Sequence, residues 1–321
     1  MDLPQEQLQF LHIGNILDET IKITAKSPKT FLLVALTLIL PLSLAILCNS
    51  IFTFPLFLLI DISHPIKFLF IYEIYHIILI VLAILSTSAV VFISASIYTS
   101  KPVSFLSTMS AIPNLFSRLF KTFLCISLLM SVYNLLILLV INLVTFPESS
   151  DKIFINLLFI FFIFAIALAL VHVQVYITAL CFMASAVSVL EPVNGFSAFK
   201  KSYRLLKGKT MMVFFLTYFY VLPSVGMNMV SGIVVFADVG DPVSLVFRIV
   251  SGGFLVAFFV LLNLGGLVTI SVLYYVCKSY HCETIDKTAL FDHLEGYLGE
   301  YVPLMSTSNS SSTIQMEIVN L

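Results

Sequence analysis

The sequence predicts an all-α membrane protein with six transmembrane helices, arranged as three parallel helical-hairpin repeats that each follow a cytosolic amphipathic segment. The first observation behind this prediction is the composition: of 321 residues, 60% are hydrophobic and only 10% are charged, with a mean hydropathy of +1.09. Soluble domains carry about 25% charged residues. The second observation is a set of six long uncharged runs, and the third is a recurrence of short motifs ahead of alternate runs.

The composition also excludes several classes of function. A net charge of -1 argues against a nucleic-acid partner, because phosphate binding requires a basic surface. The chain lacks the sequence motifs of hydrolases, metalloproteases, phosphate loops and dinucleotide-binding folds. We therefore expect a non-enzymatic membrane protein without a cofactor, which organises membrane lipid or partner proteins.

The five cysteines are scattered without CxxC spacing, so neither a disulfide framework nor a zinc site is indicated. Cys277 and Cys282 flank the cytosolic end of the last uncharged run. Thiols beside a membrane can be acylated, which makes these two residues candidate acylation sites. Ordinary reduced cysteines are the other interpretation.

Residues 1–29 contain no long apolar stretch and no small-residue cleavage site, so we expect a cytosolic amphipathic segment rather than a cleaved signal peptide. Each uncharged run exceeds the roughly 20 helical residues that cross a ~30 Å hydrocarbon core. The runs lack the alternation of barrel strands, which leaves the helix as the spanning structure. Within a transmembrane domain at 30–277, the predicted helices cover residues 31–53, 75–99, 122–145, 153–188, 210–236 and 249–276.

The fourth run, 153–190, is longer than one perpendicular crossing requires, since its length as a helix is about 57 Å. It must tilt or project beyond the membrane. After the sixth run, the apolar pattern predicts a short cytosolic helix within 278–302, and the Ser-rich residues 303–321 predict a disordered tail.

The Lys and Arg residues indicate the orientation. Thirteen of the sixteen fall on the side that carries both termini, and three fall on the other side. By the positive-inside rule both termini are cytosolic. The run lengths do not separate the endomembrane system from the plasma membrane.

Short motifs recur ahead of every odd-numbered predicted helix. "KPVSFLS" from Lys101 and "EPVNGFS" from Glu191 match at Pro, Val and Ser, and each precedes an amphipathic segment. A Lys-Thr pair then stands at each helix entrance, as Lys29-Thr30, Lys121-Thr122 and Lys209-Thr210. These recurrences predict three parallel repeats about an axis along the membrane normal.

The segment from Glu191 to Lys209 holds five of the sixteen Lys and Arg residues and predicts a basic amphipathic helix. Asn194 is the predicted N-cap, and Gly208 is predicted to adopt the left-handed conformation at the end. The predicted apolar half holds Phe196, Ala198, Phe199, Tyr203, Leu205 and Leu206, and the basic half holds Lys200, Lys201, Arg204 and Lys207.

Such a helix lies in the membrane interface, with its cations toward anionic headgroups. The four cations are therefore candidate contacts to lipid or to a partner, and the simpler interpretation is that they only fix the orientation of the chain. The matching segment at 103–120 is more apolar, and Pro113 predicts a bend in it.

A few polar residues lie deep within the runs, where such residues either join helices or line a path for a solute. These candidate intramembrane contacts are Asn134, His172, Gln174 and Asn263. They support an alternative hypothesis, a transporter of a small or lipophilic solute with its path along the repeat axis.

Several stretches together resemble a known family, namely "LQFLHIGNILDETIKI", "SPKTF", "KPVSF", "EPVNGFSAFKKSYRLLKGK" and "HLEGYLGEYVPL". Nearly end to end, the chain resembles a plant family of uncharacterised multi-pass membrane proteins. The fourth stretch is also distantly similar to one in the membrane domain attached to some bacterial glycerophosphodiester phosphodiesterases. The resemblance implies a fold and a membrane location, and no activity.

Overall fold

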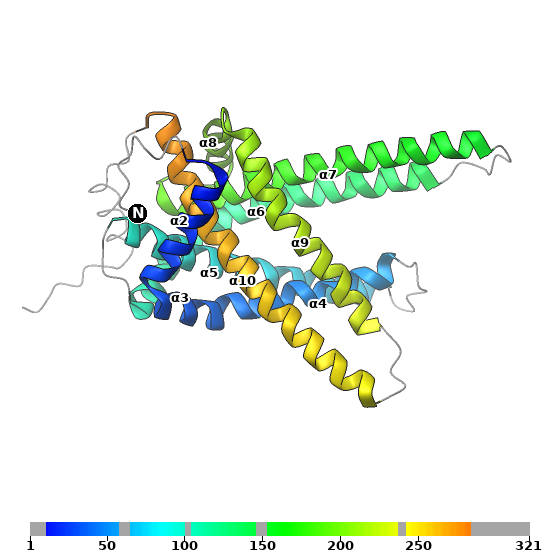
Figure 1. The fold of residues 1–321 in the computed structure, drawn as a ribbon, viewed down its shortest axis with the longest axis horizontal. Helices are drawn as coiled ribbons and strands as arrows, with labels where there is room; N and C mark the ends of the chain where they lie inside the picture. Colours follow the sequence, from blue (N-terminus) through cyan, green and yellow to red (C-terminus); the bar gives the residue numbers. More distant parts are fainter. Residues whose placement is uncertain (1–10, 58–64, 100–103, 146–152, 237–241, 284–321) are drawn as a thin grey trace, which may run out of the picture.

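The structure, a computed structural model, describes residues 11–57, 65–99, 104–145, 153–236 and 242–283 (Figure 1). All regular secondary structure in these ranges is helical. The elements are α2 (Ile13–Lys26), α3 (Pro28–Val34), the π-helical turn η1 (Ala35–Ile39), α4 (Leu40–Phe57), α5 (Pro65–Tyr98), α6 (Phe105–Thr145), α7 (Ile153–Leu190), α8 (Phe196–Leu206), α9 (Thr210–Phe236) and α10 (Pro242–Tyr280). Residues 1–10, the predicted cytosolic helix beyond residue 283, and the predicted tail at 303–321 lie outside the described residues.

Six helical stretches of the described chain are long and apolar enough to cross a membrane. They are Pro28–Cys48, Ile74–Tyr98, Phe105–Ile137, Phe161–Leu190, Thr210–Gly232 and Val246–Tyr280. This confirms the predicted class, an all-helical integral membrane protein with six candidate spans.

The first span is interrupted by the wide turn η1, which ends two residues before Pro41. Proline cannot donate a backbone hydrogen bond, and in a regular α-helix its ring clashes with the carbonyl four residues earlier, here that of Thr37. A π-helical turn changes the register at this point. The uniform helix predicted for 31–53 therefore consists of three consecutive helical pieces.

The three predicted amphipathic segments differ in how they join their spans. The first and third are separate helices, α2 and α8, whereas the second is the beginning of α6 and runs into the span through Pro113 without interruption. Ser27 before Pro28 and Gly208 are stop signals that end α2 and α8. Residues 114–122 contain neither Pro nor Gly, so nothing in that sequence ends the second helix.

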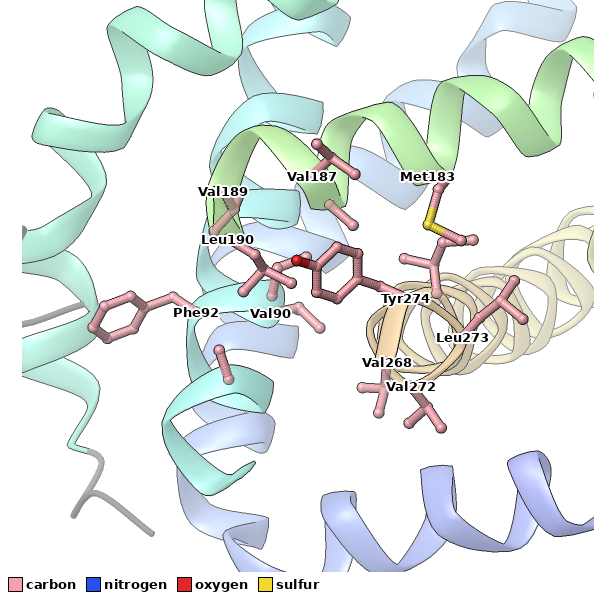
Figure 2. Close-up of a cluster of buried hydrophobic side chains, with 14 of the residues drawn as sticks. Val90, Phe92, Met183, Val187, Val189, Leu190, Val268, Val272, Leu273 and Tyr274 are labelled. Atoms are coloured by element: carbon pink, nitrogen blue, oxygen red, sulfur yellow. The ribbon is translucent and has the colours of Figure 1, made fainter. Parts of the chain in front are cut away.

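Buried side chains gather at one end of the bundle, the end that carries α2 and α8, which we call the α8 end (Figure 1). In Figure 2, Tyr274 of α10 points toward Val90 of α5 and Val187 of α7, so these three helices meet there. Small residues are frequent at the contact, in 86–96 of α5 and 184–188 of α7. Small side chains let membrane helices approach closely, and the resulting van der Waals packing is one of the forces that associate helices in lipid.

Away from the α8 end the helices are less covered. The hairpin of α6 and α7 projects furthest, and Phe161, Phe162 and Phe164 on its far half are largely exposed (Figure 1). α2 packs on α10 and α8 packs on α7, while α6 packs on α5. The amphipathic elements are thus fastened to the part of the bundle where packing is tightest.

Candidate functional site

Helix α8 is fixed to the bundle along one narrow face. Ala198, Ser202, Leu205 and Leu206 are buried, at the i, i+4, i+7 and i+8 positions of a helix. The hydroxyl of Ser202 donates to the carbonyl oxygen of Leu180 on α7, at 3.2 Å. The small residues on this face bring α8 close to α7, so the orientation of the helix is set by the bundle.

The start of α8 differs from the prediction, and its end agrees with it. Asn194 is not the cap: Gly195 precedes the first helical residue with a φ of 57°, and its N–H donates to Oγ1 of Thr122 at 2.9 Å. The prediction failed because Gly195 can take a positive φ at little cost, which lets a neighbouring helix satisfy the backbone instead. Gly208 has a φ of 97°, as predicted, and lies against the ring of Tyr280.

The opposite face of α8 carries three exposed cations, Lys200, Arg204 and Lys207. Two aromatic side chains share this face, since Phe196 is 79% exposed and Tyr203 is 55% exposed. The predicted apolar half is therefore divided between the bundle and the surroundings. Its aliphatic residues pack inward, while two of its rings lie beside the cations.

The fourth cation, Lys201, is turned toward the bundle. Its Nζ lies 2.5 Å from Oε2 of Glu191, the residue that follows α7, and 3.3 Å from Oε2 of Glu283. Only 23% of the Lys201 side chain is exposed. Of the four candidate lipid contacts, the structure thus leaves three directed outward and places the fourth in an ion-pair network.

Glu191 is the centre of this network. Its side chain is 9% exposed, and its Oε1 accepts hydrogen bonds from the hydroxyl of Tyr274 at 2.6 Å and from Nζ of Lys278 at 3.0 Å. The backbone carbonyl of Glu191 also accepts a hydrogen bond from Arg118 of α6. One residue therefore joins α6, α7, α8 and α10.

The charges in the network stabilise one another. Burial alone would raise the pKa of the Glu191 carboxyl, but the hydrogen bonds from Lys201, Tyr274 and Lys278 outweigh burial and hold the pKa below its ordinary value of 4.5. Burial alone would lower the pKa of Lys201, but Glu191 and Glu283 raise it above 10.5. Both groups are charged throughout the neutral range.

Sequence reasoning missed Glu191 as a partner for the basic residues. The available signal was its position as the first charged residue after a 38-residue uncharged helix. A carboxylate at such a boundary needs a partner when it is buried. The identity of the partners depends on how α8 and α10 fold back on α7.

The predicted intramembrane polar residues are not brought together. Asn263 is buried and joins three helices: its Oδ1 accepts from the hydroxyl of Tyr220 on α9 at 2.8 Å, and its Nδ2 donates to Oγ of Ser43 on α4 at 3.0 Å. Gln174 donates to the sulfur of Met130 at 3.8 Å.

The other two predicted residues lie on the outside of the bundle. Asn134 and His172 are exposed, and Nδ1 of His172 lies 3.0 Å from the carbonyl oxygen of Leu168 on its own helix. Of the path proposed from sequence, only Asn263 faces the enclosed space at the centre.

That space is a cavity of 190 Å³ among the six spans. Each span contributes at least one lining residue, and these include Leu42, Thr87, Met130, Ser185, Tyr220 and Asn263. Its volume lies below the roughly 300–1,000 Å³ of typical ligand pockets. The cavity can hold a small solute or a part of a larger one.

The two candidate acylation sites differ in access. Cys277 is buried in α10, whereas Cys282 is exposed in the turn that follows, with a φ of 54°. Among the residues that the structure describes, no group of three His, Cys, Asp or Glu side chains is placed to hold a metal ion.

Comparison with known proteins identifies a family without a stated activity. A family model described as a domain of unknown function (DUF8558) matches residues 1–66 and 58–319. No curated protein and no solved structure matches the chain.

Proposed function

We propose that this chain, which belongs to the DUF8558 family, is a non-enzymatic integral membrane protein that gathers anionic lipid at its cytosolic face through helix α8. The observation that carries the proposal is the exposed face of α8, where Lys200, Arg204 and Lys207 lie beside Phe196 and Tyr203. Aromatic rings favour the headgroup region of a bilayer, and each cation near an anionic surface contributes about 1 kcal/mol.

The attachment of α8 favours this function. Because its inward face is buried and Lys201 pairs with Glu191, the exposed cations are already arranged before lipid arrives. Binding to a preformed surface avoids the cost of ordering a flexible segment. A solvated loop with the same charges would lack this advantage.

The proposal includes the predicted orientation and repeat. The arrangement that supports a threefold repeat is cyclic: α2 packs on α10, α6 on α5 and α8 on α7, so each helix that contains an amphipathic segment contacts the second helix of another hairpin. Glycosylation acceptor sites inserted at 58–64, 146–152 or 237–241 should be modified, and the native Asn309 should not. Modification of Asn309 would place the tail outside and α8 on the wrong side for anionic lipid.

Lipid selectivity tests the proposed role of α8. The full chain is reconstituted with spin-labelled phosphatidylserine or phosphatidylcholine, and the immobilised fraction of each lipid is measured. Wild type should select phosphatidylserine severalfold, and the selectivity should fall with salt, because the Debye length shortens. The Lys200→Gln, Arg204→Gln, Lys207→Gln triple variant should lose most of it.

A charge-matched control separates α8 from net charge. Lys26, Lys29 and Lys121 are also exposed at the α8 end, and changing these three to Gln removes the same charge. This control should keep more than half of the selectivity. Equal losses in the two triple variants, or no loss in either, would leave the cations of α8 only a role in orientation.

The central cavity favours a second candidate, a transporter of a small or lipophilic solute, because all six spans line it and Asn263 offers it a polar group. Saturable solute flux into reconstituted vesicles would support this function if Asn263→Leu abolished it. Asn134→Leu is the matched control, since Asn134 is exposed away from the cavity. Flux that is linear in solute concentration and equal in both variants would exclude transport through the cavity.

A further inference from the structure

A second space lies outside the six-helix centre, in a groove between α2, α9 and α10. Its volume is 330 Å³, within the range of ligand pockets, and it is open on one side. Tyr220 forms part of its inner wall, where the ring lies against Gly266 so closely that an added Cβ would come within 2.9 Å of the ring. The groove is therefore separated from the central cavity by packed side chains.

The lining of the groove suits hydrocarbon. None of the described residues that line it is charged. Its three threonines have partners within the protein. Oγ1 of Thr20 donates to the carbonyl of Ile16 and Oγ1 of Thr217 donates to that of Val213, each at 2.8 Å, and Oγ1 of Thr269 lies 3.3 Å from Oγ1 of Thr20. A polar ligand would lose its hydration here without gaining new partners.

The rim of the groove is continuous with the surface that two membrane spans present to lipid. Ile21, Phe219 and Leu261 line the groove and are 68%, 68% and 66% exposed. Phe219 and Leu261 belong to the spans Thr210–Gly232 and Val246–Tyr280. The molecules next to such an opening are the hydrocarbon chains of the bilayer, and an apolar space of this kind does not hold water well.

The dimensions of the groove agree with one leaflet. Along α10 its lining extends from Leu261 to Leu273, a rise of about 18 Å. Half of a ~30 Å hydrocarbon core is about 15 Å. Its end at α2 lies beside the polar residues Asp18 and Lys22, which suit the headgroup level, and the end at Leu261 lies deeper in the span.

We propose that this groove is a binding site for a single hydrocarbon chain of a membrane lipid, which enters laterally from the bilayer and lies along α10. The site is distinct from the anionic-lipid surface of α8, because it recognises the chain and not the headgroup. Gly265 forms its floor, and a Cβ added there meets nothing within 4 Å. The first carbon of a larger side chain at this position therefore enters the groove without a clash.

The test uses a phosphatidylcholine with a photoactivatable group in its acyl chain, added to the purified full-length protein in detergent. Cross-links to α9 and α10 are located by mass spectrometry. In wild type, labelling around Phe219 and Leu261 should saturate and should be displaced by unlabelled phosphatidylcholine. Gly265→Leu should reduce it at least fivefold, and the smaller Gly265→Ala should reduce it less.

Gly252→Leu is the matched control, because Gly252 lies on the same helix with equally open space around it and does not line the groove. It should be labelled like wild type. A photoactivatable free fatty acid, used in parallel, shows whether the bound chain needs a phospholipid headgroup. Displacement by either lipid supports a hydrocarbon-chain site.

Non-saturable labelling that is equal around Leu261 and around the lipid-facing Phe254 would overturn the proposal. Full labelling of both Gly265 variants would also overturn it, provided that these variants keep the unfolding midpoint of wild type. The triple Gln variant of α8 should be labelled like wild type. The hydrocarbon-chain site in the groove and the anionic-lipid role of α8 can thus be refuted independently.

Discussion

Replacing Glu191 by Gln should be among the most destabilising single changes at the α8 end. The substitution keeps the shape of the side chain and removes the charge that Lys201 and Lys278 share. These lysine side chains are 23% and 17% exposed, so water can replace only part of the lost interaction. Removing one partner of a buried ion pair costs 3–5 kcal/mol, and partial access points to the lower end, about 3 kcal/mol.

The chain has no Trp, so its own fluorescence offers little signal, and buried thiols are a better probe. Cys181 and Cys277 are buried, and a thiol-reactive dye reports their exposure as the detergent-solubilised protein is heated. The exposed Cys48 and Cys282 are first changed to Ser in every variant. A loss of about 3 kcal/mol should lower Tm by roughly 4 °C in a chain of 321 residues.

Two neighbouring lysines give a matched comparison. Lys201→Gln leaves Glu191 with Lys278 and Tyr274 and should cost about 1–2 kcal/mol, while Lys200→Gln removes an exposed charge and should stay within about 0.5 kcal/mol. Combined with Glu191→Gln, Lys201→Gln should show a coupling of about 1 kcal/mol. If Glu191→Gln unfolded at the same temperature as Lys200→Gln, the network would make no contribution to stability.

The same network sets a pH dependence. The pKa of Glu191 is lowered, so its contribution is present above the ordinary value of 4.5 and is lost as the pH falls through the lowered value. The pKa of Lys201 is raised, so its contribution is present below 10.5 and is lost as the pH rises through the raised value. The stability difference between wild type and Glu191→Gln should be constant from about pH 5 to 10 and should shrink in acid.

Two further predictions concern the chain on either side of the network. Gly208→Ala should destabilise the protein by about 1–3 kcal/mol, because φ is 97° and the new Cβ would lie 2.5 Å from the ring of Tyr280. The control is Gly252→Ala, which lies in open space within a helix and should be neutral or slightly stabilising in the same melting assay. Acyl-exchange labelling should be lost in Cys282→Ser and kept in Cys277→Ser, since Cys277 is buried. Labelling that persisted in both single variants and in the double variant would eliminate acylation at these two cysteines.

The class of the protein could be predicted because lipid imposes a strict rule on sequence. Charged side chains are costly in the membrane, so each span appears as an uncharged run. The left-handed Gly208 was equally predictable, because few other residues adopt a positive φ at a helix end. The continuity of α6 could also have been predicted, since 114–122 lacks any residue that ends a helix.

The contacts of α8 required the fold. A helical wheel separates apolar from basic residues, but it does not say which side meets a neighbouring helix. The inward face is centred on Ala198 and Ser202, whose small side chains allow close approach to α7, and not on Phe196 and Tyr203. Glu191 meets Lys278 across 87 positions of sequence, a pairing that no local pattern encodes.

The long hairpin of α6 and α7 is held at the α8 end and projects from the bundle at its other end, which has a mechanical consequence. Both helices are fastened near Glu191, through the ion pairs at the end of α7 and the hydrogen bond from Arg118 of α6. α7 also contacts α9 through His172 and Tyr176, so the free arm comprises its first 19 residues, 153–171, and is about 28 Å long. A pivot of about 5° displaces the far end by about 2.5 Å on an arm of that length. A change at the α8 end would thus be transmitted to the far end of the hairpin.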